Sequence, residues 1–170
     1  RAVKFRNGIV VLKGAAVSMT VDGARWSTLT SAAPWGDARA EPWLLVHRDR
    51  LWVIGGYSGY DSPDEVLYND VWSSQDGVTW ELVNANSEWA PRRWATATVY
   101  DNKIFLVGGA NPALWPEEHG NTAEVWFTSD GIRWVELKSE RQWPARHAAF
   151  VTTGIQEDLV VLAGYGHGGV

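Results

Sequence analysis

Three arginines recur at one position along this chain and are the first candidates for chemistry. Arg39, Arg92 and Arg146 each precede a stretch of apolar and β-branched residues that ends in glycine. A guanidinium group can donate two parallel hydrogen bonds to a carboxylate, so a row of arginines suits an acidic ligand or partner. The alternative is that a repeated residue serves the repeat itself, here by bracing neighbouring units through backbone carbonyls.

Two long segments, Tyr57–Tyr68 and Ala110–Thr122, differ from each other in content and form the second group of candidates. Their aromatic, carboxylate and imidazole side chains, with the histidine after the third arginine, give the candidates Tyr57, Tyr60, Asp61, Trp115, Glu118, His119 and His147. Aromatic rings beside carboxylates bind sugars by stacking, and the same combination is common at protein interfaces. A solvated loop that packs its own aromatic residues is the remaining interpretation.

Catalytic and metal-binding patterns find little support in the sequence. The chain has no cysteine, which excludes disulfides, thiolate zinc sites and cysteine nucleophiles. No nucleophile elbow is present, and no carboxylates are paired at a repeated spacing. The run 117–119 lacks a second histidine at ligand spacing, and Asp61, Asp64 and Glu65 make at most a weak calcium site. We therefore predict a non-catalytic protein with no cofactor and no metal.

Composition narrows the range of partners. The 170 residues include 15 basic and 20 acidic side chains without a basic run, which argues against nucleic acid. No apolar run reaches about 18 residues, so no membrane span is expected. The absence of cysteine fits an exported bacterial protein and a cytosolic one alike. The chain begins at Arg1 without a signal peptide, as expected of a processed product or an excerpt.

A period of 54 residues organises the chain. Asp-Gly pairs recur at Asp22, Asp76 and Asp130. A tryptophan follows each aspartate at a fixed distance, and a second tryptophan comes nine residues later. These two series are Trp26, Trp80 and Trp134, and Trp35, Trp89 and Trp143. Side chains that recur in phase over two full periods indicate a repeat protein, and the tryptophans are expected to fill equivalent positions in its core.

Each full period is interpreted as four β-strands. The runs Leu51–Ile54 and Ile104–Val107 are apolar throughout, as expected of strands that are buried on both faces. A glycine pair follows each of them, and the Asp-Gly pair supplies a tight turn between two further strands. Four antiparallel strands in a repeat of about 50 residues are the blade of a β-propeller. The sequence therefore predicts an all-β fold.

The glycine pair, the first tryptophan series (Trp26, Trp80 and Trp134) and the arginine that opens each repeat together resemble a kelch repeat over essentially the whole chain. The segments Ser73–Trp80 and Phe127–Trp134 also resemble the Asp-box hairpins of sialidase-type propellers. One departure is that the kelch tyrosine is replaced by Met19, Ser73 and Phe127. The resemblance implies a bacterial kelch-type propeller with Asp-box-like outer hairpins. Galactose oxidase shares this architecture, but its crosslinked copper site needs a cysteine that this chain lacks.

The repeat divides the chain into two whole blades and two partial ones. We expect a single propeller segment, with blade parts at residues 1–30, 39–84, 92–138 and 146–170. Propellers close with about four to eight blades, and we expect six or seven in the intact ring. About three blades cannot close alone, so either missing blades or a second chain must complete the ring.

Taken together, the sequence predicts a non-catalytic binding module. Its binding surface is the loop rim, and the favoured partner is a protein. The alternative is a propeller that binds or processes glycans, in the manner of sialidase-like or sugar-epimerising kelch propellers. A pure scaffold, in which the loops bind nothing, is the third interpretation. The fold by itself does not decide among them.

Overall fold

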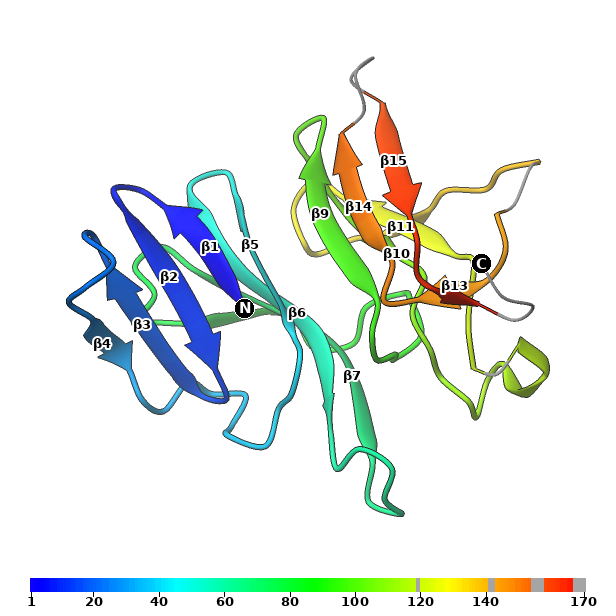
Figure 1. Ribbon diagram of the computed structural model, residues 1–170, viewed down its shortest axis with the longest axis horizontal. Coiled ribbons are helices and arrows are strands. Elements are labelled where there is room, and N and C mark those ends of the chain that lie inside the picture. Colours follow the sequence, from blue (N-terminus) through cyan, green and yellow to red (C-terminus); the bar gives the residue numbers. More distant parts are fainter. Residues whose placement is uncertain (119, 141–142, 154–157, 167–170) are drawn as a thin grey trace.

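The fold is all-β. The computed structural model describes residues 1–118, 120–140, 143–153 and 158–166. Three four-stranded antiparallel sheets follow one another along these residues, and two strand pairs come after them. Besides the strands there is one short 3-10 helix, η1 (Pro116–Glu118), in the described part of the chain (Figure 1). The all-β prediction and the four-stranded antiparallel units are therefore confirmed.

Within each four-stranded sheet the strands are hydrogen-bonded in chain order, so hairpins connect them. The first sheet consists of β1 (Ala2–Phe5), β2 (Gly8–Lys13), β3 (Ala16–Thr20) and β4 (Ser27–Thr30). The second consists of β5 (Trp43–His47), β6 (Arg50–Ser58), β7 (Val66–Ser74) and β8 (Glu81–Asn84). The third consists of β9 (Thr96–Tyr100), β10 (Lys103–Val107), β11 (Val125–Thr128) and β12 (Val135–Glu136).

The last described strands form two separate pairs. β14 (Phe150–Thr153) pairs with β15 (Leu159–Leu162), and β13 (Arg146–His147) pairs with β16 (Tyr165–Gly166). They occupy the start of the fourth predicted blade part, of which residues 154–157 and 167–170 lie outside the described residues.

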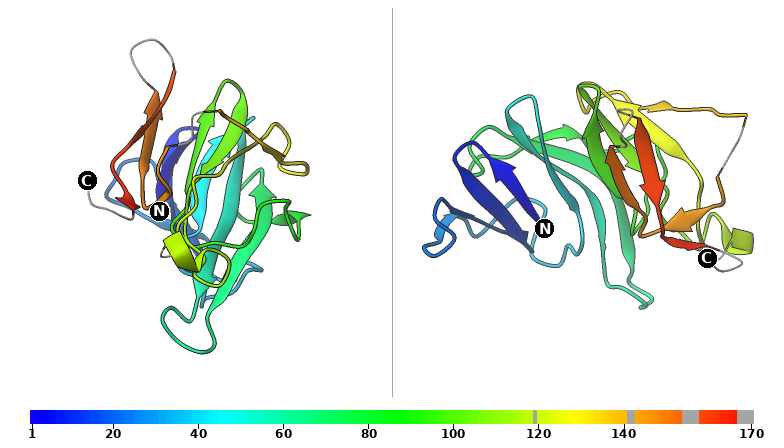
Figure 2. Two further views of the ribbon diagram at one scale, coloured as in Figure 1. Left: turned by 90° about the vertical axis from the view of Figure 1, so that its right-hand side faces the viewer. Right: turned by 45° about the horizontal axis from the view of Figure 1, so that its top comes forward.

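The first strands of consecutive units lie next to one another. β1 contacts β5, β5 contacts β9, and β9 contacts β14. Figure 2 shows the sheets following one another along an open arc, and the described residues form no closed ring. The blade count and the division into blades therefore stay predictions.

The central strand β6 is buried on both faces. Residues 51–54 are at most 5% exposed. Successive side chains of a strand point to opposite faces. Leu51 and Val53 accordingly join a core cluster with the first sheet, whereas Trp52 and Ile54 join one with the third. The apolar run expected to form a doubly buried strand does so because a sheet lies on each side of it.

One face of the first sheet is uncovered within the described residues. Ile9 of β2 occupies the repeat position of Leu51 and Ile104. Leu51 and Ile104 are both 0% exposed, but Ile9 is 46% exposed. The position is buried by a neighbouring sheet in the second and third units. An exposed apolar residue at the same position of the first sheet indicates that its uncovered face also suits packing against a neighbouring sheet.

The two tryptophan series pair with each other across adjacent sheets. Trp35, which follows the first sheet, packs edge-on against Trp80 of the second, with ring centroids 4.7 Å apart. Trp89 packs in the same way against Trp134 of the third sheet at 5.8 Å. Edge-to-face aromatic pairs add to the free energy gained from burial alone. The tryptophans therefore join neighbouring units, which explains why both series keep one period.

The Asp-Gly hairpins are structural, as predicted. Asp76 Oδ1 accepts hydrogen bonds from the backbone N–H groups of Val78 and Thr79, each at 2.8 Å. Ser74 Oγ accepts from Gly77 N at 2.8 Å, and the β11–β12 turn repeats the pattern with Asp130. The backbone hydrogen bond from Thr79, followed by that from Val78, lowers the pKa of Asp76 below its ordinary value.

Trp80 and Trp26 occupy the same repeat position and provide a matched pair for testing the packing between sheets. Trp80 is 9% exposed, whereas Trp26 is 51% exposed. We expect Trp80→Ala to lower the free energy of unfolding by about 3 kcal/mol or more, and Trp26→Ala by less than about 1 kcal/mol. Urea denaturation of both variants measures the difference, and equal losses would contradict the assigned role of the tryptophan pairs.

Candidate functional site

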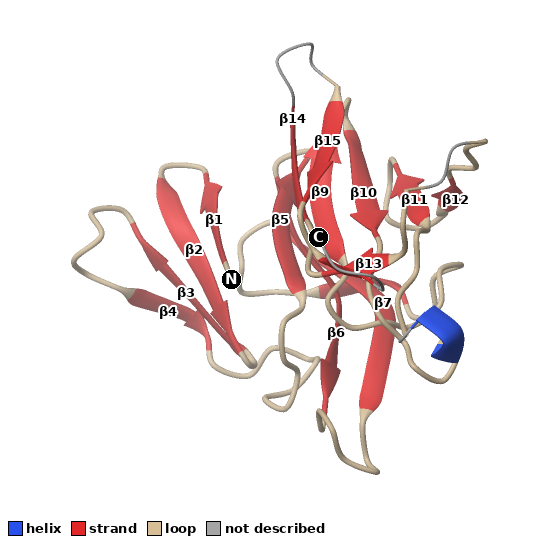
Figure 3. Cartoon of the chain, turned by 45° about the vertical axis from the view of Figure 1, so that its right-hand side comes forward, coloured by secondary structure: helices blue, strands red, loops and turns tan. Residues whose placement is uncertain are grey.

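The candidate residues lie on one side of the sheets, which we call the loop face. It consists of the segments 39–42, 92–95 and 146–149 before each first strand, and the hairpin loops 57–66 and 110–122. Backbone bridges join the two groups, between Ala40 and Tyr57 and between Arg93 and Ala110. Figure 3 shows the far end of the β6–β7 hairpin and the η1 helix extending from this side. The Asp-Gly turns lie in the β3–β4, β7–β8 and β11–β12 hairpins instead.

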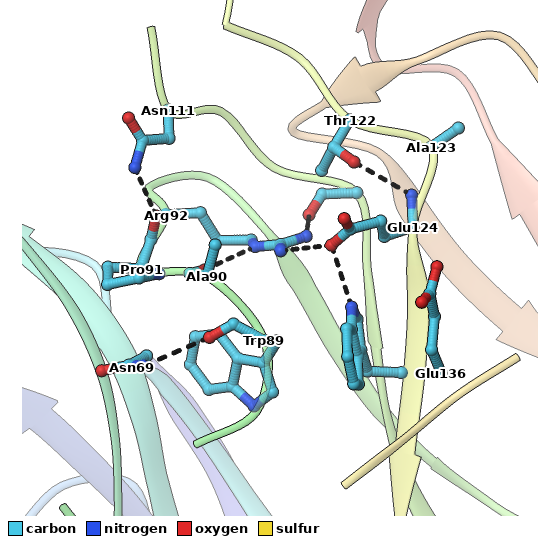
Figure 4. Close-up of polar contacts among 12 residues, drawn as sticks. Asn69, Trp89, Ala90, Pro91, Arg92, Asn111, Thr122, Ala123, Glu124 and Glu136 are labelled. Atoms are coloured by element: carbon cyan, nitrogen blue, oxygen red, sulfur yellow. Dashed lines mark hydrogen bonds and ion pairs between the residues drawn. The ribbon is translucent and has the colours of Figure 1, made fainter. Parts of the chain in front are cut away.

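Arg39 and Arg92 are turned into their own sheets. Arg39 is 5% exposed, and its guanidinium forms a bidentate pair with Asp70 at 2.5 and 2.7 Å. It also donates to the carbonyl of Gly55 at 2.9 Å. Arg92 is 2% exposed and repeats the arrangement, with Glu124 in place of Asp70 and Gly108 O as the carbonyl acceptor (Figure 4). These contacts are those of a brace between strands.

The glycine pairs permit this close approach. Gly56 and Gly109 have φ angles of 100° and 107°, which favour glycine. A Cβ atom on Gly109 would lie 2.9 Å from Cδ of Arg92, and one on Gly56 would lie 2.7 Å from the Ala40 carbonyl oxygen. The repeated glycines and the repeated arginines are therefore parts of one packing arrangement.

Arg146 keeps only part of this arrangement. Its Nη1 donates to Ala163 O at 2.7 Å and its Nε to Pro144 O at 3.1 Å. It is half-buried, and no carboxylate pairs with it within the described residues. The contacts favour the bracing interpretation for the first two arginines. Binding of a carboxylate by the row stays a prediction, with Arg146 the member best placed for it.

A layer of aromatic rings covers the loop face between the second and third sheets. Tyr57, 8% exposed, lies beneath Tyr60 and Trp94, with ring centroids 5.7 and 6.3 Å away. The guanidinium of Arg93 stands over the rings of Tyr60 and Trp94 at 4.9 and 4.4 Å and pairs with Glu65. Such cation–π contacts hold rings in place. Burial and then the charge of Glu41 raise the pKa of Tyr57.

His147 extends this layer towards the last described strands. Its ring lies 4.8 Å from that of Trp94 and stacks on Tyr165 at 5.6 Å. Nδ1 is 2.5 Å from Asn121 Oδ1, an acceptor, so Nδ1 carries the proton. Burial and then the positive charge of Arg93 lower the pKa of His147, which keeps the imidazole neutral at pH 7.

The other predicted residues are distributed along the two loops. Asp61 is exposed at the tip of the β6–β7 loop, with a φ angle of 56°. Trp115 packs its ring against the guanidinium of Arg92 at 4.9 Å. Glu118 ends η1, but its side chain and the whole of His119 lie outside the described residues. The structure thus brings together Tyr57, Tyr60 and His147, whereas Trp115 lies with Arg92.

Sequence reasoning missed the residues that hold this layer together. Arg93, Trp94 and Asn121 were not among the candidates, and Glu65 was considered only as part of a weak calcium site. The first two directly follow the repeated arginine, where the other repeats have Ala40-Glu41 and His147-Ala148. Positions that vary beside a repeated residue were therefore a usable signal. The contacts of Glu65 and Asn121 join different sheets, and spacing along the chain does not reveal such contacts.

Within the described residues, no group of three or more histidine and acidic side chains is placed to hold a metal ion. In the same residues no helix is long and apolar enough to cross a membrane.

The fold defines this chain as an all-β protein built from consecutive four-stranded antiparallel sheets. No protein family description and no curated protein matches it. Among solved structures it is similar to one described as the structure of YjhT, with a TM-score of 0.67 and 15% sequence identity. The match covers 88% of this chain and 52% of that one, so this chain spans about half the length of its structural neighbour. At this identity the similarity concerns the fold alone.

The pair of Arg92 and Glu124 makes stability depend on pH. Burial by itself would raise the pKa of Glu124, but the hydrogen bond and charge of Arg92 outweigh it and lower that pKa. A carboxylate whose pKa is lower in the folded state stabilises the fold above its unfolded pKa of about 4.3. That contribution is lost as the pH falls through the folded pKa.

We therefore expect Glu124→Gln to lower the free energy of unfolding by about 3 kcal/mol at pH 7, because Arg92 is left buried without a counter-charge. At pH 3 the difference from the wild type should shrink, because the wild-type carboxylate begins to be protonated. Urea denaturation at both pH values measures this. Arg50 pairs with Glu81 at an exposed site, and Glu81→Gln is the control, expected to cost less than about 1 kcal/mol. A difference for Glu124→Gln that stays constant with pH would contradict the assigned pair.

Proposed function

We propose that the chain is a segment of a kelch-type β-propeller that acts as a non-catalytic binding module. The 54-residue repeat, the four-stranded sheets and the contacts between consecutive first strands support this proposal. In it, residues 39–84 and 92–138 are whole blades, and residues 1–30 and 146–170 are parts of two more. Further blades, from the same chain or a second one, complete a ring of six or seven.

The binding surface in this proposal is the loop face, and its partner is a protein. The observation that carries the proposal is the exposure of two rings above a fixed aromatic layer. Tyr60 and Tyr165 are 51% and 73% exposed, and each packs on a ring of this layer, Tyr60 on Trp94 at 5.3 Å and Tyr165 on His147 at 5.6 Å. Arg93 lies over the rings of Tyr60 and Trp94 and pairs with Glu65. Tyrosine, tryptophan and arginine dominate the binding energy of protein interfaces. A pre-ordered surface also loses less conformational entropy on binding.

The test is a photo-crosslinking amino acid placed at Asp61, beside Tyr60, in the cells that make the protein. The crosslinked partner is identified, purified and titrated against the chain. We expect Tyr60→Ala to raise the Kd for that partner at least about tenfold, since the loss of an interface tyrosine costs more than about 1.4 kcal/mol.

Ile132→Ala is the matched control, because Ile132 is 56% exposed but lies in the β11–β12 turn, away from the loop face. Its Kd should equal that of the wild type. Equal affinities of the Tyr60→Ala variant and the wild type for the crosslinked partner would refute the proposed surface.

A glycan is the second candidate, because of the ring of Trp115. This ring stands 4.9 Å from the guanidinium of Arg92, with the carboxylate of Glu124 on the same guanidinium. The arrangement combines a ring with polar groups, as sugar recognition requires. If glycans are the ligands, the chain binds members of a glycan array and Trp115→Ala abolishes that binding, whereas Tyr165→Ala retains it. An array without any bound glycan counts against this candidate.

A further inference from the structure

Consecutive units of this chain are connected in a regular way on the loop face. The residue after the second and the third repeated arginine meets the hairpin loop of the preceding unit. Arg93 pairs with Glu65 from the loop of the second sheet. His147 contacts Asn121 from the loop of the third sheet at 2.5 Å. At these two junctions, therefore, a polar side chain of the preceding hairpin loop, Glu65 or Asn121, contacts the segment that leads into the next sheet.

The junction between the first and second sheets lacks such a loop. Strands β2 and β3 are joined by Gly14 and Ala15 alone, whereas the loop between β6 and β7 runs from residue 59 to 65. A pocket of about 490 Å³ lies at this junction, beside Ala40, the counterpart of Arg93 and His147. It exists because the hairpin is too short to fill the space.

The pocket carries separate charges of both signs. Lys13 and Arg1 contribute cationic groups, and Asp37 and Glu41 contribute carboxylates. Asp37 is held in place by a hydrogen bond from Ala15 N at 3.1 Å. All four residues are exposed, and within the described residues none of their side chains forms a salt bridge. The guanidinium of Arg1 is held over the ring of Trp43, 4.3 Å from its centroid, and one oxygen of Asp37 accepts from Ala15 N. The charges of all four groups are therefore not neutralised by a partner within the described residues, and they can pair with a charged ligand.

Arg39 also lines the pocket, but its guanidinium is committed to the second sheet. Its two terminal nitrogens are occupied by Asp70 and Gly55 O, but its Nε is buried and has no acceptor among the described residues.

We propose that this pocket binds a small zwitterion, such as an α-amino acid or a short peptide. Its ammonium group lies towards Asp37 and Glu41, and its carboxylate towards Lys13 and Arg1. The volume is within the usual range of small-molecule sites, about 300–1,000 Å³. A simple anion or cation leaves half of the charged groups unpaired. None of the residues lining the pocket is aromatic, so a sugar finds no ring to stack on. The site is independent of the protein partner proposed above.

The experiment is an NMR titration of the ¹⁵N-labelled chain with glycylglycine. We expect the amide signals of Gly14, Ala38 and Ala40 to shift, with a Kd of about 1 mM. Glu41→Gln should raise the Kd about tenfold, because it removes one carboxylate from the ammonium site. Glu140→Gln is the matched control, since it makes the same change of charge at an exposed residue that does not line the pocket, and its Kd should equal that of the wild type.

The same titration with acetate, methylammonium and methyl α-D-glucopyranoside tests the class of ligand. All three should bind at least about tenfold more weakly than glycylglycine, because acetate and methylammonium each pair with charges of only one sign and the glucoside carries no charge. The proposal is overturned if glycylglycine causes no shift at these amides up to about 10 mM. It is also overturned if one of the three binds as tightly as glycylglycine, or if Glu140→Gln weakens binding as much as Glu41→Gln.

Discussion

Burial of sheet faces against neighbouring sheets is the constraint on which the rest of this structure depends. A four-stranded sheet that is apolar on both sides cannot be stable alone in water, because its exposed faces forgo the free energy of burial. Strand β6 satisfies the constraint completely, with residues 51–54 enclosed between the first and third sheets. The edge-on pair of Trp35 with Trp80 connects the first sheet to the second, and that of Trp89 with Trp134 connects the second sheet to the third.

Since the sheets are held together in this way, the loops can vary without loss of the fold. Beneath them, Arg39 and Arg92 join the segment before each sheet to its strands through buried ion pairs. These pairs use the arginine charge for structure, so the side chains left to meet a ligand are those that differ between units. Tyr60, Trp94 and His147 are examples, and each is set on the same framework.

The junctions on the loop face show how one framework yields different surfaces. Where the preceding hairpin is long, Glu65 or Asn121 reaches across to the next sheet and closes the space. Where only Gly14 and Ala15 join the strands, the space remains a pocket. The length of one hairpin therefore decides between a closed aromatic surface and an open pocket lined by charged residues. This is the usual division in repeat proteins, where repeated positions build the core and variable ones make the surface.

Much of the fold was predictable from the sequence because its determinants are local and repeated. The apolar run Leu51–Ile54, the glycine pairs and the hydrogen-bonded Asp-Gly turns depend on a few neighbouring residues, and a fixed period identifies them. Tyr57, Tyr60 and His147 were also named from the sequence, as aromatic or titratable residues at variable positions, and their binding role stays a prediction. The contact of Arg93 with Glu65, and the pocket beside Glu41, were not predictable from spacing. Thus the sequence determined the strands and their order, since these follow from hydrophobic pattern and turn chemistry. Only the tertiary structure decided which side chains of adjacent units meet, because such contacts depend on the distance between sheets rather than on separation along the chain.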